Sequence, residues 1–432
     1  MLNKTRSAMN VFVLLLAVGA VGCAAKPADT QEEANKPEAA QPVTITIAAH
    51  GGAITDEEVQ RYIADPVKKK YPHITVKRIN IAEKGQTLRE LVAAKEIPDI
   101  AANFPLNMNE LVELGLHYNM DELIKKYRFD VNRVQPELVQ SIKIGSDLDY
   151  LAGLPMFNQA FALFYNKELF DRFGVPYPKD NMTWEEVRDL AVKMTRSESG
   201  VQYWGLWPDG AYRGAYQVSL PWVDAKNSKP VFQSQGWQDL FNLWYSLYKI
   251  PGYPPKGTNY AKEFTTGHLA MMTDSTSTLK SMLAVKDFNW DVVTYPQNAQ
   301  APGVGQRVDS YTMAITSQSK NKDAAFQVLS VVLSDEVQTD MSRNGRLSVL
   351  KDSGIQNQFG KDIGEYSSKN VLAFTKLKLA LLQSFKNLPA ATIIINSFND
   401  VLYSGKDINT ALREADEQMA KAIAELLKQP NK

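Results

Sequence analysis

Strand-like runs alternate with helical patterns where the folded part of this chain begins. Val43–Ala49 (VTITIAA) alternates β-branched side chains and ends at a His-Gly-Gly turn. A helical pattern follows, and Pro72 stops it before further strands at Ile74–Ile81 and Ile100–Ala102. This order of strand, helix and strand predicts an α/β fold with a mostly parallel sheet covered by helices.

The ends of these predicted strands supply the first candidate ligand contacts. In open α/β sheets a ligand lies beyond the carboxyl ends of the strands. His50 follows the first strand, and Asn103 and Phe104 follow the third. We therefore expect these three side chains to border a binding site.

Length and charge limit the domain count and the partners. The region from Val43 onward holds about 390 residues, more than a single hydrophobic core usually serves, so about two domains are expected. The 48 Lys and Arg residues balance the 48 Asp and Glu residues. Phosphate binding needs concentrated positive charge, and no basic stripe stands out, so nucleic acid is not expected as a partner.

The start of the chain has the layout of an export signal. Lys4 and Arg6 precede an apolar run, Val11–Val21, which is far shorter than the roughly 18 to 20 residues that span a bilayer. We therefore predict a signal peptide over residues 1–22 and export of the remainder. Cys23 follows it and is the only cysteine, which excludes an internal disulfide and argues against a thiol active site.

The residues before Cys23 resemble the lipobox of bacterial lipoproteins, although Ala20 stands where that motif prefers leucine. The resemblance implies that Cys23 is lipidated, and several acyl chains would hold the protein on the outer face of the cytoplasmic membrane. A lone cysteine buried in a core is the alternative. Residues 24–42 contain no apolar side chain larger than proline, which predicts a flexible tether over residues 23–42, with a surface helix as the alternative.

The stretch Tyr150–Met194 gives the most detailed local prediction. Ala160–Tyr165 is expected to form an apolar strand, and Lys167–Phe173 a short helix that Gly174 stops. Thr183, followed by Trp-Glu-Glu, forms a capping box at the start of a helix with one apolar face. A Gly-Leu-Pro turn precedes the strand.

This succession resembles the family 1 extracellular solute-binding proteins, the receptors of ATP-driven ABC importers, to which maltose-binding protein belongs. Three further segments resemble the family in the same order: Phe264–Met272 (FTTGHLAMM), Ser319–Gln338 and Tyr403–Ala420. The resemblance covers the chain from about Val43 to its end. It implies a type II periplasmic-binding-protein fold, in which two discontinuous α/β lobes joined by a multi-strand hinge close on a ligand in the cleft between them.

The resemblance also implies a division into lobes and a function. The N-terminal lobe would comprise residues 43–155 plus 268–308, and the C-terminal lobe residues 156–267 plus 309–432. The chain would cross between them near residues 155–158, 265–268 and 308–314.

The implied function is that of a monomeric receptor without a cofactor. It would bind a carbohydrate, in particular an oligosaccharide, and deliver it to the permease subunits of an ABC importer. A receptor of the same fold for a peptide, a polyamine or another polar solute is the first alternative, and a polysaccharide-processing enzyme is the second.

Five of the seven tryptophans lie between residues 204 and 244, and their settings differ. Trp237 and Trp244 are seven residues apart on one apolar helix face, which predicts packing. Trp207 and Trp222 stand among glycines and prolines, where the chain turns, and we expect them to project into the cleft.

The predicted ligand contacts combine aromatic faces with polar groups. Aromatic rings suit the C–H patches of sugar rings, and the hydroxyl groups require hydrogen-bond partners. The set comprises His50, Asn103, Phe104, Phe157, Asn158, Trp207, Tyr212, Trp222, Asp274, Asp309 and Tyr311. For each polar member, an ordinary turn or capping role is the alternative.

Catalytic and metal sites are not indicated. The carboxylate pairs Glu110 with Glu113 and Glu185 with Glu186 have surface or capping explanations, and neither a Gly-x-Ser-x-Gly nor a His-Glu-x-x-His motif occurs. The segment Gly303-Val-Gly-Gln lacks the third glycine of a dinucleotide site. The four histidines are scattered, whereas capture of a transition metal needs clustered ligands.

Overall fold

The alternating strands at the start of the folded part build the sheet of the first lobe. Its strands stand in the order β2 (Ile74–Asn80), β1 (Val43–Ala49), β3 (Ile100–Asn103), β13 (Tyr311–Ile315) and β4 (Leu154–Phe157). Strand β1 pairs in parallel with β2 and β3, which confirms the predicted parallel start of the sheet. Strand β13 pairs antiparallel with β3 and β4, so a distant segment closes this sheet.

This architecture comes from a computed structural model that describes residues 41–224, 226, 228–383 and 388–428. The predicted signal peptide, Cys23 and nearly all of the predicted tether lie outside the described residues. Within the described residues, no helix combines the length and the apolar character required to cross a membrane.

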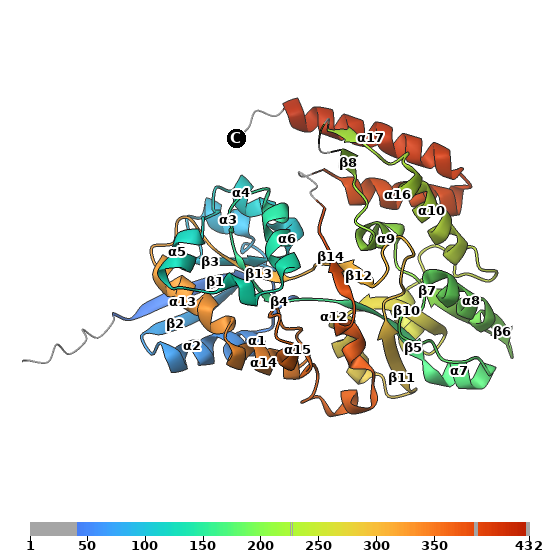
Figure 1. Ribbon diagram of the computed structural model, residues 1–432, viewed down its shortest axis with the longest axis horizontal. Helices are drawn as coiled ribbons and strands as arrows, with labels where there is room; N and C mark the ends of the chain where they lie inside the picture. The colour runs from blue at the N-terminus through green and yellow to red at the C-terminus, as the bar shows by residue number, and fades with distance from the viewer. Residues whose placement is uncertain (1–40, 225, 227, 384–387, 429–432) are drawn as a thin grey trace, which may run out of the picture. The chain divides into compact units, whose positions relative to one another are not determined.

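The helices of the first lobe come from both ends of the chain. Figure 1 shows α13 (Lys322–Val332) and α14 (Asp335–Arg343) beside the N-terminal helices, and α13 packs against α2 (Asp65–Lys70). The other helical segments are α1 (Asp56–Val59), η1 (Gln60–Ala64), α3 (Leu88–Ala93), η2 (Pro105–Asn107), α4 (Asn109–Glu113), α5 (Asp121–Lys126), η3 (Val131–Arg133), α6 (Pro136–Ser146) and α15 (Ser353–Gln356). A single buried apolar cluster joins these elements to the first sheet.

The second lobe is built on another five-stranded sheet. Its strands stand in the order β11 (Trp290–Thr294), β5 (Phe161–Asn166), β10 (Leu269–Ser275), β7 (Val201–Trp207) and β6 (Arg196–Glu198). Strand β10 runs parallel to β7 and antiparallel to β5, so the sheet is mixed. Two short pairs accompany it: β12 (Val304–Arg307) with β14 (Lys378–Ala380), and β8 (Val223–Asp224) with β9 (Lys229–Pro230).

The helices of the second lobe include the longest of the described chain. In Figure 1 the red helix α17 (Ile408–Lys428) runs beside α16 (Ala390–Ser404), and both contact α10 (Gln235–Tyr248). The others are α7 (Lys167–Phe173), α8 (Trp184–Met194), α9 (Ala211–Gln217), α11 (Tyr260–Thr265), α12 (Thr276–Ser281), η4 (Met282–Ala284), η5 (Gly364–Ser368) and η6 (Val371–Thr375). Two buried apolar clusters fill this lobe.

Local signals around Thr183 are confirmed. The Thr183 hydroxyl accepts a hydrogen bond from the Glu186 amide at 3.2 Å, and the Glu186 carboxylate accepts one from the Thr183 amide at 2.8 Å. Gly174 ends α7 with φ of 64°, a left-handed conformation that glycine adopts without steric cost. Trp184 is buried and packs against Trp244 with ring centroids 4.9 Å apart.

The predicted division into lobes requires correction. Residues 268–308 contain β10 and β11, which lie in the second sheet rather than the first. The segment from β13 to α14 belongs to the first lobe, not the second. The predicted crossing near residues 265–268 is therefore wrong, and the chain instead returns to the second lobe after α15, whose Ile355 is part of the first-lobe core. The three misplaced strands β10, β11 and β13 are largely buried apolar runs, and such a run does not specify which of two sheets it joins.

Candidate functional site

Tyr311 organises the carboxyl ends of the strands in the first lobe. Its hydroxyl accepts a hydrogen bond from the His50 amide at 3.0 Å, which ties β13 to the end of β1. Its ring lies 5.1 Å from that of Phe104 and stacks at 5.4 Å on that of Phe157. Tyr311 and Phe157 are each only 1% exposed, and burial raises the pKa of Tyr311 to about 12. Tyr311 thus holds the backbone of the exposed His50, and Phe157 packs against Tyr311.

Asn103 positions the next loop of the first lobe. Its side-chain oxygen accepts hydrogen bonds from the Phe104 amide at 2.9 Å and from the Asn107 side-chain amide at 3.2 Å. Phe104 is half-buried and Asn107 is exposed. The predicted residue Asn103 therefore holds in place a neighbour, Asn107, that the sequence analysis did not select.

Asn158 and Asp309 meet where the chain passes between the two sheets. The Asn158 amide donates to the Leu347 carbonyl at 3.0 Å, and the Asn158 side-chain oxygen accepts from the Asp309 amide at 3.4 Å. Two chain segments that connect the sheets are thus joined at Asn158, together with the segment between α14 and α15 that contains Leu347. Asn158 is buried, whereas Asp309 keeps part of its carboxylate accessible.

Trp207 and Trp222 both lie in the second lobe but differ in exposure. Trp207, at the end of β7, is half-buried and stacks on Tyr260 with ring centroids 3.5 Å apart. Trp222 is only 2% exposed and packs among Phe232, Trp237 and Tyr216. The expectation that Trp222 projects into a cleft does not agree with this burial. Its aromatic neighbours come from separate parts of the chain, so local turn residues did not reveal them.

Charged side chains gather beside the start of α9, and the sequence analysis missed most of them. Arg213 donates from Nε to Asp209 at 3.0 Å, and its guanidinium lies over the rings of Phe161 and the predicted residue Tyr212 at 4.7 and 5.2 Å. Burial raises the pKa of Asp209, while the charge of Arg213 opposes this shift. Burial disfavours the charge of Arg213, yet Asp209 holds the Arg213 pKa above its ordinary value. The two side chains thus form a close ion pair, 3.0 Å apart, in which burial of Asp209 and the charge of Arg213 act in opposite directions on the Asp209 pKa.

A second arginine, Arg307 of β12, lies near this group. Its guanidinium covers the ring of Tyr216 at 4.3 Å, and its Nη2 is 3.7 Å from the carboxylate of Asp309. The predicted residue Asp274 lies at the end of β10, half-buried, and accepts a hydrogen bond from the Ser275 amide at 2.6 Å. Arg213 and Arg307 thus each lie over aromatic rings, with carboxylates of Asp209 and Asp309 within 4 Å.

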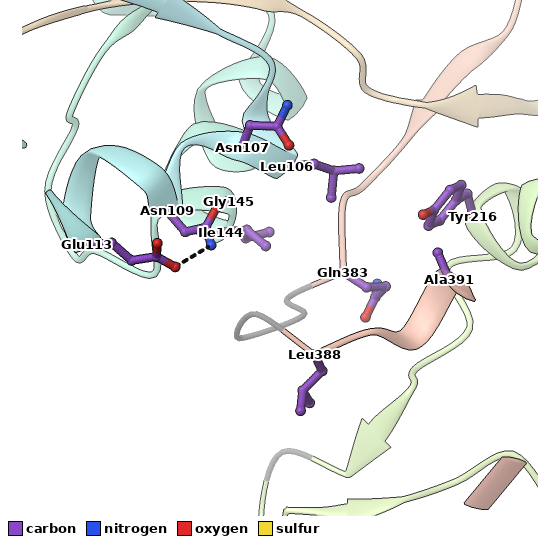
Figure 2. A pocket seen from close by; sticks show the side chains of 10 residues that line it. All are labelled: Leu106, Asn107, Asn109, Glu113, Ile144, Gly145, Tyr216, Gln383, Leu388 and Ala391. Atoms are coloured by element: carbon purple, nitrogen blue, oxygen red, sulfur yellow. Dashed lines mark hydrogen bonds between the residues drawn. The ribbon is translucent and has the colours of Figure 1, made fainter. Parts of the chain in front are cut away.

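A pocket of about 430 Å³ is lined by residues of both lobes. Figure 2 shows Leu106 and Asn107 facing it from the first lobe and Tyr216 and Ala391 from the second. The remaining lining residues are Asn109, Glu113, Ile144, Gly145, Gln383 and Leu388. None of the predicted contacts lines this pocket, although Asn107 bonds to Asn103 and Tyr216 packs on Tyr212 with ring centroids 5.7 Å apart. For Tyr212 and Tyr216, which lie on the same helix α9, the four-residue spacing was the signal available in the sequence.

Gly145 allows the first-lobe wall of this pocket to form. A Cβ atom at Gly145 would lie 2.0 Å from the carbonyl oxygen of Pro105. The absence of a side chain lets α6 approach η2, which carries Leu106 and Asn107. Among the described residues, no cluster of three or more His, Cys, Asp or Glu side chains is arranged to hold a metal ion.

The two-lobed fold agrees with solved structures over nearly the whole chain. A sugar transporter from Rhizobium etli in an open conformation superposes with a TM-score of 0.70 at 19% identity, covering 88% of this chain and 99% of that one. An ABC substrate-binding protein from Listeria monocytogenes in complex with cycloalternan gives 0.69 at 19% identity, covering 89% and 99%. These similarities define the class: a two-lobed α/β protein of the type II periplasmic-binding-protein fold.

The sequence itself assigns the family. Residues 62–363 match the profile of the bacterial extracellular solute-binding proteins, and this chain belongs to that family. It is similar to the multiple sugar-binding protein of Streptococcus mutans, 24% identical over 38% of this chain and 37% of that protein. It is also similar to the mannitol-binding protein of Pseudomonas aeruginosa, 26% identical over 44% and 47%. The chain thus aligns with less than half the length of these two relatives. Membership implies an exported protein.

Proposed function

We propose that this protein binds a saccharide between its two lobes and delivers it to an ABC importer. The observation that carries the proposal is the pocket lined from both lobes, with the ring of Tyr216 on one wall and the amide of Asn107 on the other. A ligand that contacts both walls stabilises the arrangement in which they approach, because it gains contacts there that are missing when they separate. Closure of this kind would present a loaded receptor to the permease subunits.

The pocket fits a saccharide in size and in chemistry. Its volume of about 430 Å³ falls within the range of roughly 300 to 1,000 Å³ that is common for small-molecule sites. A micromolar complex needs about 8 kcal/mol, and one net hydrogen bond supplies only about 0.5 to 1.5 kcal/mol. Several polar groups must therefore act together with the aromatic rings. The predicted contacts that keep some exposure, among them His50, Tyr212, Asp274 and Asp309, are proposed as further contacts.

The comparisons favour a saccharide over other solutes. One relative is named a multiple sugar-binding protein, and the neighbour from Listeria monocytogenes was solved in complex with cycloalternan. The relative named a mannitol-binding protein makes a polyol the second candidate ligand. Binding without catalysis is the proposed activity, in agreement with the family. The proposal includes a monomeric receptor held on the outer face of the cytoplasmic membrane by lipid on Cys23.

A thermal-shift screen tests this proposal. The purified chain is heated with mono- and oligosaccharides, polyols, peptides, polyamines and divalent metals. A ligand at a hundred times its dissociation constant stabilises the folded state by about 2.7 kcal/mol. A shift confined to saccharides supports the proposal, and a shift with polyols alone favours the second candidate. Shifts with only peptides, polyamines or metals contradict both.

A further inference from the structure

Arg307 is a buried cation whose side chain makes no hydrogen bond within the described residues. The residue is 7% exposed, and its Nε and Nη1 atoms have no partner there. Its nearest carboxylate, Asp309, stands 3.7 Å from Nη2, which is beyond hydrogen-bond distance. The N–H groups of a buried guanidinium normally donate hydrogen bonds, because a buried donor without a partner has lost its hydrogen bond to water, which costs free energy. The missing partners therefore call for an explanation.

One donor atom of Arg213 also lacks a hydrogen-bond partner. Its Nε is bonded to Asp209, but its buried Nη1 has no partner among the described residues. Arg213 and Tyr216 lie one turn apart on α9, and Arg307 covers the ring of Tyr216. Arg307 thus contacts the ring that lines the pocket between the lobes, and the Arg213 guanidinium lies over the neighbouring ring of Tyr212, which packs on Tyr216.

All three unpartnered atoms are hydrogen-bond donors. A sugar hydroxyl brings one donor with each acceptor oxygen, whereas an ionised carboxylate brings acceptors only. The carboxylates already nearby are engaged or distant: Asp209 bonds to Arg213, Asp274 bonds to the Ser275 amide, and Asp309 does not reach Arg307. A ligand carboxylate matches this surplus of donors better than a neutral sugar does, since a guanidinium binds it with strong, charge-assisted hydrogen bonds.

We infer that the ligand is an acidic saccharide, one that carries a uronate carboxylate, and that Arg307 with Arg213 binds this carboxylate. The inference rests on the proposed function and specifies its substrate class. Only 9% of the Arg307 side chain is accessible, so a shift of the Tyr216 ring accompanies entry of the carboxylate. Asp309, which keeps part of its surface in solvent, then turns away from Arg307.

Calorimetry on the purified full chain tests the inference with matched ligands. The probes are oligogalacturonate, oligomannuronate and glucuronate-substituted xylo-oligosaccharides, each compared with the same oligosaccharide after reduction of its carboxyl groups to alcohols. We expect at least one acidic probe to bind ten times or more tighter than its reduced form. The substitution Arg307→Gln is expected to weaken the acidic probe at least tenfold and the reduced form less than threefold. Arg413→Gln, on the exposed face of α17, is the matched control and is expected to change neither affinity.

The outcomes separate the inference from the function on which it rests. If the reduced forms bind as tightly as the acidic forms, or if Arg307→Gln weakens both forms equally, the acidic ligand is wrong while saccharide binding stands. If no saccharide binds in either form, the proposed function fails as well. Should Arg307→Gln not fold, as judged by its thermal unfolding, Arg213→Gln takes its place, with the same selective loss expected.

Discussion

Arg346 donates two hydrogen bonds to the carboxylate of Glu58, from Nε at 2.8 Å and from Nη2 at 2.7 Å, although the two residues lie 288 positions apart in the sequence. The guanidinium also lies 4.4 Å from the ring centre of Phe157, the last residue of β4. Lys280, from the second lobe, approaches the same carboxylate at 3.9 Å. Segments from both lobes therefore meet at Glu58, next to the point where the chain crosses between the sheets.

Removal of Arg346 should destabilise the protein strongly. Arg346→Met leaves the carboxylate of Glu58 buried without its main partner, and such a loss typically costs about 3 to 5 kcal/mol. Arg343→Met is the matched control, because the pair that Arg343 forms with Asp362 is exposed and such pairs contribute little to stability. Denaturant unfolding measures both changes. Equal losses in the free energy of unfolding for the two variants would show that the buried pair of Arg346 and Glu58 is no more important than the exposed one.

The same pair should make stability sensitive to acid. Burial acts to raise the pKa of Glu58, but the hydrogen bonds and charge of Arg346 outweigh it and hold the pKa below its ordinary value of 4.5. A depressed pKa gives stability that is present above the unfolded-state value and is lost as the pH falls through the folded-state value. The stability difference between the native chain and Glu58→Gln should therefore shrink as the pH falls below about 4.5. A difference that is constant from neutral pH to pH 3 would show that Glu58 does not titrate in this way.

Substitutions at Trp222 should change stability, whereas a substitution at Asn107 should change saccharide affinity. Trp222→Ala should cost about 3 to 5 kcal/mol of stability, whereas Trp222→Phe, which keeps an aromatic ring, should leave saccharide affinity within about twofold. Asn107→Ala removes an exposed amide from the pocket and should lower affinity by about 5- to 10-fold without loss of stability. Calorimetry and thermal unfolding of the same preparations measure both quantities. If Trp222→Phe lowered affinity more than Asn107→Ala, the earlier placement of Trp222 in the site would be restored.

Gly145 should tolerate no side chain. Gly145→Ala places a methyl group 2.0 Å from the Pro105 carbonyl oxygen, so α6 and η2 must move apart. Overpacking of this kind costs about 1 to 3 kcal/mol and should also lower ligand affinity, because Asn107 lies on η2. Gly364→Ala meets no atom within 4 Å and serves as the control. Unchanged unfolding of Gly145→Ala would show that the contact between α6 and η2 is not fixed.

Local structure could be predicted from the sequence more completely than long-range assembly. The capping box at Thr183, the left-handed Gly174 and the parallel strands β1, β2 and β3 each depend on neighbouring residues or on a simple strand-helix order, and the structure confirms them. The lobe assignment of β10 and β13 failed because it depends on pairings across more than a hundred residues.

The candidate site shows the same division. Asn103 and His50 lie at strand ends, as the fold rule for ligand sites predicts. Trp222 was selected from its turn-forming neighbours, yet its burial is set by Trp237 and Phe232. Arg307 carries no local sign of its proposed role, because an arginine at the end of a short strand is ordinary until the structure shows that its Nε and Nη1 atoms lack partners among the described residues.

Hydrogen exchange measured by mass spectrometry tests the central claim, that a saccharide binds between the lobes. A saccharide that raises the unfolding temperature should slow exchange in residues 103–113 of the first lobe and 207–217 of the second at the same concentrations. The separate surface hollow formed by Tyr248, Tyr253 and Tyr403 should exchange at an unchanged rate. Protection confined to one lobe, or centred on that hollow, would contradict the account.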